Sequence, residues 1–203
     1  MKTNYILVCF AILALIGCKS APSNTSDKSD ETSSVSSYKI PPKATVTDYD
    51  NNTKLVVIAT DDKKGEERGL LVNGKKHGTW TVFNKDGYPK VIRSYMNGQK
   101  HGSTYYLDAR ARVKKREDYV ANKLNGQIVG YGTSQIVMTS NHLNDVLEGS
   151  YTRYYPNGEL MEESNYTNGL KNGESTYYAK SGAIKMKYLY KEGKMIKELD
   201  KSQ

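Results

Sequence analysis

The sequence predicts an all-β protein in which tandem antiparallel β-hairpins form an extended single sheet, a β-solenoid-like array. Three observations point to this fold class. Glycine recurs about every 24 residues from Gly78 to Gly173, the stretches between these glycines are rich in tyrosine, and no window shows the 3.6-residue apolar spacing of a helix. The 203 residues include 17 tyrosines but only 2 phenylalanines and 1 tryptophan. Because tyrosine buries its ring while its hydroxyl stays in water, this composition suits a thin sheet better than a large globular core.

Residues 1–17 have the pattern of a signal peptide. Lys2 precedes an apolar run that is too short to span a bilayer. The run closes with Leu15-Ile16-Gly17-Cys18, which resembles the bacterial lipobox, where a small residue precedes a cysteine that becomes diacylated. The resemblance implies cleavage after Gly17 and a membrane anchor on Cys18. A plain secretory leader with an incidental cysteine is the alternative.

The residues that follow the leader predict a tether and an address. Cys9 leaves with the leader, so the mature chain keeps one cysteine, and neither an internal disulfide nor a Cys-rich metal site can form. Lys19, and not aspartate, follows the anchor cysteine, which resembles the sorting signal of outer-membrane lipoproteins. The side of the membrane that carries the anchor stays open. Eight of the 18 residues from Ser20 to Ser37 are serine. We therefore expect residues 18–40 to form a lipid-anchored, disordered tether.

Further residues recur at fixed distances from the periodic glycine, and each such position is called a column by its distance. Column 0 holds Gly78, Gly102, Gly126, Gly149 and Gly173. Column 5 holds Phe83, Leu107, Tyr131, Tyr154 and Tyr178, and column 9 holds Gly87, Ala111, Gln135, Gly158 and Gly182. Column 11 holds Pro89, Val113, Val137, Leu160 and Ile184, column 17 holds Tyr95, Tyr119, Leu143, Tyr166 and Tyr190, and column 20 holds Gly98, Asn122, Val146, Gly169 and Gly193.

These columns describe one β-hairpin per repeat. A strand follows the column 0 glycine, a turn ends at column 9, and a second strand runs to column 17 before an Asn-Gly turn starts the next repeat. Columns 11 and 17 are an even number of residues apart, so we expect them to share a face with column 5, the packed side of the sheet. Residues 78–190 then form the repeats, with the third the most degenerate. Residues 41–77 form a degenerate N-terminal cap, and residues 191–203 form a charged end that protects the last edge from pairing.

The last repeats resemble a known family. Tyr154-Tyr155-Pro156-Asn157-Gly158-Glu159-Leu160, then Tyr166-Thr167-Asn168-Gly169-Leu170-Lys171-Asn172-Gly173, are similar to the bacterial MORN-repeat variant, whose proteins are often grouped with the YwqK-type antitoxin family. The resemblance covers about residues 68–196 and is weakest in the third repeat. It implies a hairpin-repeat sheet used for binding, and it implies no single conserved activity.

The sequence offers no catalytic constellation, so we expect neither an enzyme nor a cofactor or metal. His77 and His101 occupy the same repeat position, which duplication explains without chemistry, and His142 has no evident partner. The carboxylate pairs Glu66-Glu67 and Glu162-Glu163 are adjacent, and neighbours on a strand point to opposite faces. The sequence contains no serine elbow and no phosphate loop.

Composition and leader together favour a non-catalytic binding or scaffold lipoprotein with a protein, glycan or lipid-headgroup partner. The formal charge of +8 is interpreted as a solvated basic surface, and export argues against nucleic acid. An immunity-type protein that neutralises a toxin in the envelope is the alternative, and the oligomeric state stays open. The aromatic residues outside columns 5 and 17 are the candidates for an exposed binding surface: Trp80, Tyr105, Tyr106, Tyr151 and Tyr155.

Overall fold

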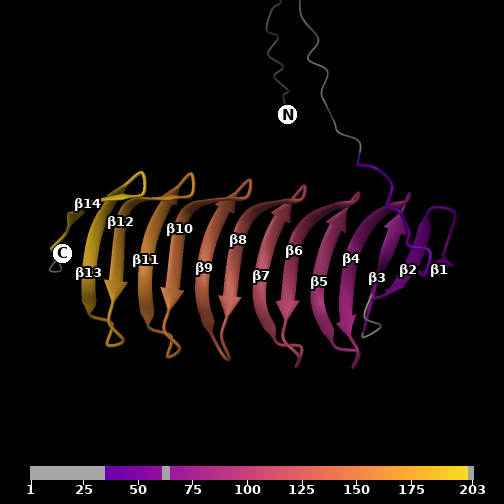
Figure 1. Cartoon of the computed structure of the whole chain (residues 1–203), viewed down its shortest axis with the longest axis horizontal. Helices are drawn as coiled ribbons and strands as arrows, with labels where there is room; N and C mark the ends of the chain where they lie inside the picture. The colour runs from indigo at the N-terminus through magenta and orange to yellow at the C-terminus, as the bar shows by residue number, and fades with distance from the viewer. Residues whose placement is uncertain (1–34, 61–64, 201–203) are drawn as a thin grey trace, which may run out of the picture. The chain divides into compact units, whose positions relative to one another are not determined.

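The computed structural model describes residues 35–60 and 65–200, and these form one open antiparallel sheet of 14 strands (Figure 1). Each strand pairs with its neighbours in the chain, so spatial order equals sequence order and β1 and β14 are the two edges. This confirms the predicted all-β array of hairpins. The strands are β1 (Thr45–Asp48), β2 (Thr53–Ala59), β3 (Gly65–Val72), β4 (Lys75–Asn84), β5 (Pro89–Met96), β6 (Gln99–Leu107), β7 (Val113–Val120), β8 (Lys123–Tyr131), β9 (Ile136–Leu143), β10 (Val146–Tyr154), β11 (Leu160–Thr167), β12 (Leu170–Tyr178), β13 (Ile184–Lys191) and β14 (Lys194–Glu198).

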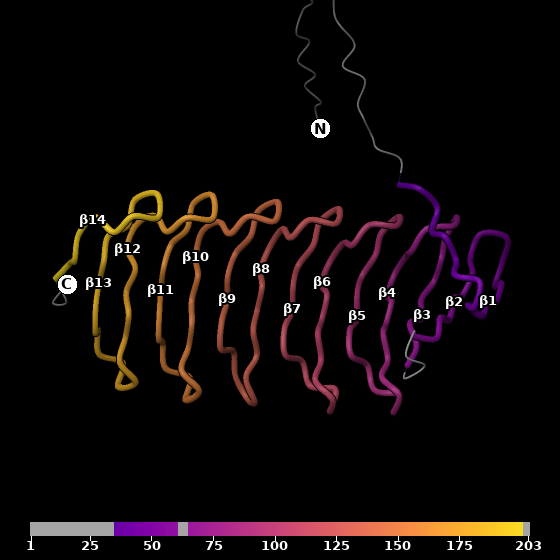
Figure 2. The backbone as a smooth tube through the Cα atoms, in the orientation of Figure 1, coloured from indigo at the N-terminus to yellow at the C-terminus, as the bar shows by residue number. Residues whose placement is uncertain are grey.

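The two kinds of turn lie at opposite ends of the strands, as the backbone trace shows (Figure 2). The turns between repeats have two central residues, both with positive φ, as at Asn97 (51°) and Gly98 (86°). This is the geometry of a type I′ hairpin turn, whose twist matches that of the flanking strands. The turns within repeats are longer, and in all of them except the third a positive φ falls at column 9, as at Gly158 (92°). The positive φ values expected from the turn residues are therefore confirmed at both ends of the strands.

The periodic glycine lies inside a strand rather than before it, which corrects the expected strand start. β4 begins at Lys75, three residues before Gly78. Gly78 has a φ of 64°, and the register between β3 and β4 shifts at this point. The column 0 glycine therefore supplies the left-handed backbone of a β-bulge, a conformation that costs other residues strain.

A second bulge after each hairpin turn reverses the faces that we expected from the sequence. In the fourth repeat Tyr154 pairs with Leu160 and Arg153 pairs with Glu162, so Met161 has no residue opposite. An unpaired residue breaks the alternation of side chains along a strand. Column 11 (Leu160) therefore shares a face with column 5 (Tyr154), while column 17 (Tyr166) lies on the other face. Our expectation that columns 11 and 17 share a face is wrong.

The third repeat is one residue shorter than the others, and this changes its alignment. Tyr131 pairs with Ile136, and Gly126 pairs with His142, the position that Tyr95 and Tyr119 hold opposite their glycines. His142, not Leu143, is therefore the third member of column 17. The following turn has positive φ at Asn144 and Asp145, so Asp145, not Val146, belongs to column 20.

A buried hydrophobic cluster lies mainly in the region that we expected to be a degenerate cap. Val56, Ile58, Leu71 and Trp80 are buried together on β2, β3 and β4. Tyr38, Ile40, Ala44 and Tyr95 pack against them. Residues 35–40 are thus part of the folded unit, which corrects the expected extent of the tether, while residues 18–34 lie outside the described residues. At the other end β14 adds a strand to the sheet from within the expected charged end.

Candidate binding face

One face of the sheet carries the corrected column 17, and we call it the tyrosine face. In each hairpin the column 17 residue pairs opposite the column 0 glycine of the same repeat, as Tyr166 does with Gly149. Side chains two residues apart along the straight parts of the strands join it on this face. The column 17 members that define the tyrosine face are Tyr95, Tyr119, His142, Tyr166 and Tyr190.

At the N-terminal end of the tyrosine face, Lys76 lies among three aromatic rings. Its Nζ is 3.9 Å from the Trp80 ring centroid, 4.7 Å from that of Tyr38 and 5.3 Å from that of Tyr95. The same nitrogen donates to Oε1 of Glu67 at 3.0 Å. Burial lowers the pKa of Lys76 below its usual value, although the Glu67 carboxylate opposes the shift. Cation–π contacts and one ion pair thus stabilise a half-buried charge.

In the second repeat the centre of the cluster is a buried carboxylate instead of a lysine. Glu117 is 7% exposed and accepts hydrogen bonds from the hydroxyls of Tyr106 and Tyr119, each at 2.8 Å. Lys115 completes the cluster with an ion pair of 2.7 Å. Burial alone would raise the pKa of Glu117, but these hydrogen bonds outweigh it and lower the pKa. Burial and the neighbouring carboxylate raise the pKa of Tyr106 and of Tyr119, so both phenols stay protonated donors.

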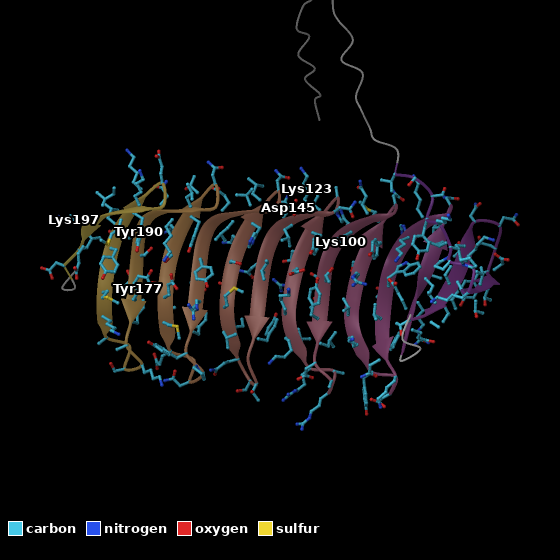
Figure 3. The ribbon with its side chains drawn as sticks, in the orientation of Figure 1. Lys100, Lys123, Asp145, Tyr177, Tyr190 and Lys197 are labelled. Carbon is cyan, nitrogen blue, oxygen red and sulfur yellow. The ribbon has the colours of Figure 1, made fainter. Side chains whose placement is uncertain are left out.

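The C-terminal repeats hold a third cluster of the same composition. Lys171 donates to Glu162 Oε1 at 2.8 Å and to the Tyr177 hydroxyl at 2.6 Å. Its Nζ lies 5.1 Å from the ring centroid of Tyr177 and 5.3 Å from that of Tyr190, which are drawn on the last hairpins in Figure 3. Burial would lower the pKa of Lys171, but the bonds to Glu162 and Tyr177 outweigh it and raise the pKa.

Between these clusters the third repeat presents an apolar stretch. On its first strand, β8, and on the next hairpin's first strand, β10, the positions of Lys76 and Lys171 are occupied by the leucines Leu124 and Leu147. His142 lies between them on β9, pairs with Leu147, and its Nδ1 is buried without a hydrogen-bond partner. The tyrosine face is therefore charged and hydrogen-bonded at both ends and apolar near its middle.

The five aromatic candidates from the sequence do not form one exposed surface. Trp80 is 0% exposed and belongs to the core, so the expectation that it lies on an exposed surface is wrong. Tyr106 and Tyr151 are partly exposed on the tyrosine face. Tyr105 pairs with Arg116 on the opposite face, and Tyr155 follows β10, with its hydroxyl donating to the Tyr178 carbonyl at 2.9 Å. Cys18 lies outside the described residues.

The lysines of the tyrosine face are functional candidates that the sequence analysis missed. Lys76, Lys100 and Lys171 all stand two residues before a column 0 glycine. Lys100 has its Nζ 3.8 Å from the Tyr119 ring centroid, the same kind of contact that Lys76 makes. The signal was present in the sequence, where a lysine stands at the same distance from the periodic glycine in three repeats.

The described residues, 35–60 and 65–200, hold two buried carboxylates and no cluster of metal-binding side chains. This part of the chain contains no group of three or more His, Cys, Asp or Glu residues that would hold a metal ion. Both of its buried carboxylates, Glu117 and Glu162, are engaged with lysine. A search of the same residues for a helix long and apolar enough to cross a membrane finds none.

The open sheet of sequential hairpins, with a bulge glycine and an aromatic column in each repeat, defines a β-hairpin repeat protein. Residues 147–168, which comprise most of β10 and all of β11, match the family model described as the MORN repeat variant. The chain therefore carries a MORN-type repeat at this place, in agreement with the resemblance found in the sequence. A search of curated proteins gives no match to the chain.

Proposed function

We propose that this protein is a non-catalytic binding lipoprotein of the bacterial cell envelope, and that its tyrosine face holds a protein partner. The observation that carries the proposal is the clustering of partly exposed tyrosines with ion-paired lysines on one face. Tyrosine and arginine are enriched in protein interfaces, and tyrosine contributes contact area with little loss of side-chain entropy.

The charges of the tyrosine face favour a protein over an anionic lipid headgroup. Lys76, Lys115 and Lys171 are each paired with a glutamate of the same face. The fourth lysine named on this face, Lys100, lies over the ring of Tyr119. Paired lysines attract a distant anion weakly, because the two charges cancel beyond a few ångströms.

The lipid anchor rests on Leu15-Ile16-Gly17-Cys18, with the outer membrane as the proposed address. The variant Cys18→Ala tests it in cells that are then fractionated and labelled with a fatty-acid probe. We expect the variant to lose both the label and the membrane fraction. A variant that keeps both contradicts the anchor.

Photo-cross-linking in intact cells tests the binding face. A photoreactive amino acid in place of Tyr106 reports on the tyrosine face, and the same amino acid in place of Tyr105 is the matched control on the opposite face. We expect a discrete cross-linked protein from position 106 and none from position 105. Equal products from both positions contradict the proposal, and a secreted toxin as the captured partner supports the immunity-type alternative.

A further inference from the structure

The tyrosine face already holds one extended segment, residues 35–40 of the same chain, which we call the strap. The backbone N–H of Tyr38 donates to the carbonyl of Gly74, in the turn between β3 and β4, at 2.7 Å. The Tyr38 ring meets Trp80 edge to face, with 5.6 Å between the ring centroids and 61° between the planes. A Cβ on Gly98 would lie 2.9 Å from Cγ1 of Val35, so the strap also lies against the next turn. The face therefore binds an extended peptide through a turn carbonyl and an aromatic side chain.

The site that receives Tyr38 recurs three repeats later. Lys76, Trp80 and Tyr95 correspond, 71 residues further on, to Leu147, Tyr151 and Tyr166. Trp80 and Tyr95 meet edge to face at 6.5 Å and 73°, and Tyr151 and Tyr166 do so at 5.8 Å and 65°. The strand opposite follows the same offset. Gly69 and Leu71 of β3 correspond to Ser140 and His142 of β9, and the turn residue Gly74 corresponds to Asp145.

The second site differs from the first in two respects that concern its occupant. The ion pair of Lys76 with Glu67 is replaced by Leu147 and Met138, so these two positions are apolar. The nearest cations are Lys171, 5.9 Å from the Tyr166 ring centroid, and Arg153, which pairs opposite Met138. Within the described chain no segment equivalent to the strap covers it: Tyr151 and Tyr166 are partly exposed, whereas Trp80 is 0% exposed. The buried Nδ1 of His142 in this site also has no hydrogen-bond partner.

We propose that Leu147, Tyr151 and Tyr166 form a docking site for an extended peptide segment of a partner protein. The segment inserts an aromatic or large apolar side chain in the way that the strap inserts Tyr38. The proposal rests on the proposed function, since it takes the tyrosine face as the binding face, and it adds the position and the chemistry of the ligand. A protein segment is favoured over a lipid headgroup or a glycan because the strap shows a peptide in the same geometry, and because the two cations beside the site, Lys171 and Arg153, are both paired with Glu162.

A fluorescein-labelled peptide with the sequence of residues 33–42 is the probe, because it contains the strap and its tyrosine. Its anisotropy is followed as the full chain is titrated in. Trp80, the one tryptophan of the sequence, lies under the strap at the first site, so its emission reports separately on that site. We expect saturable binding of the peptide with unchanged Trp80 emission.

Three variants decide where the peptide binds. Tyr151→Ser removes a ring of the second site, and Leu147→Glu keeps both rings but places a charge in the apolar part. We expect each to weaken binding about tenfold or more, as truncation of an aromatic anchor does. Tyr105→Ser on the opposite face is the matched control and is expected to change affinity by less than about twofold. A peptide with alanine in place of its tyrosine is expected to bind about tenfold more weakly as well.

Three results overturn the docking site. The first is that the peptide shows no saturable binding up to about 1 mM. The second is that the Leu147→Glu and Tyr105→Ser variants bind it with equal affinity. The third is that Trp80 emission changes in parallel with binding, which would place the peptide at the first site. The proposed function fails separately, when position 106 gives no cross-linked partner in cells. A cross-link from position 106 together with a failed peptide titration keeps the binding face and removes the second site.

Discussion

Trp80 lies directly over the backbone of Gly69 on the neighbouring strand. A Cβ added to Gly69 would fall 2.4 Å from the indole ring, which is closer than any side chain allows. The indole Nε1–H donates to the carbonyl of Leu70 at 2.9 Å, so the buried ring has its one polar group paired. The absence of a side chain at position 69 is thus what lets the tryptophan lie flat in the core of the first hairpins.

Trp80→Ala is expected to destabilise the protein by about 3–5 kcal/mol, because it empties the largest fully buried side chain of the cluster. Urea unfolding followed by circular dichroism measures the change. Tyr105→Ala on the opposite face is the control, and it is expected to cost clearly less because that ring is only partly buried. A loss within about 0.5 kcal/mol for Trp80→Ala would show a surface position instead.

Removal of the strap is expected to lower stability although it removes no strand. A chain that starts at residue 35 should unfold at the same urea concentration as the full chain. A chain that starts at residue 43 loses the contacts of Tyr38 and Ile40 with the core, and we expect a loss of about 2–4 kcal/mol and a red shift of Trp80 emission as its ring meets water. Equal midpoints for the two chains would place the strap outside the folded unit.

Column 9 offers a stabilising substitution. Ala111 has a φ of 58° where Gly87, Gly158 and Gly182 have glycine at positive φ. Ala111→Gly is expected to raise the free energy of unfolding by about 0.5–1 kcal/mol, because it removes the left-handed strain of an L-residue. Gly158→Val at the same column is expected to destabilise by about 1–2 kcal/mol or more. Thermal melts of both variants check the opposite signs, and a shared sign would contradict this register.

The third-repeat alignment predicts different effects for two adjacent residues. His142 lies on the tyrosine face with a buried ring nitrogen, and Leu143 is 52% exposed at the end of β9. We expect Leu143→Ala to change stability by no more than about 0.5 kcal/mol and His142→Ala to cost about 1–2 kcal/mol. A larger loss of stability for Leu143→Ala than for His142→Ala would support Leu143, and not His142, as the column 17 residue.

The Glu117 cluster predicts a loss of stability in acid. Its hydrogen bonds hold the pKa of Glu117 below the usual 4.5 in the folded state. A lowered pKa stabilises the folded state fully above pH 4.5, and this contribution disappears as the pH falls through the folded value. Glu117→Gln should therefore flatten the decline of unfolding free energy between about pH 5 and pH 3. The same decline in both proteins would contradict the role of Glu117.

Local sequence chemistry was sufficient to predict the repeat, its turns and the absence of helices from residues 35–60 and 65–200. Asn97-Gly98 and Asn168-Gly169 predict type I′ turns because few other pairs adopt positive φ at both residues. The period of the glycines predicts one hairpin per repeat in sequential order, which the structure confirms. These features depend on residues that are close in the chain.

The assignment of side chains to the two faces of the sheet depended on pairing between strands. A single bulge at Met161 moves Tyr166 to the face opposite Leu160, and residue counting along one strand cannot show which residue lacks a partner. The missing residue in the third hairpin likewise places His142 where Leu143 was expected. Trp80 became core rather than surface because Gly69 on another strand leaves room for its ring and Tyr38 covers it. Side-chain burial is set by which strands and segments meet in space, so the binding face emerged only from the folded chain.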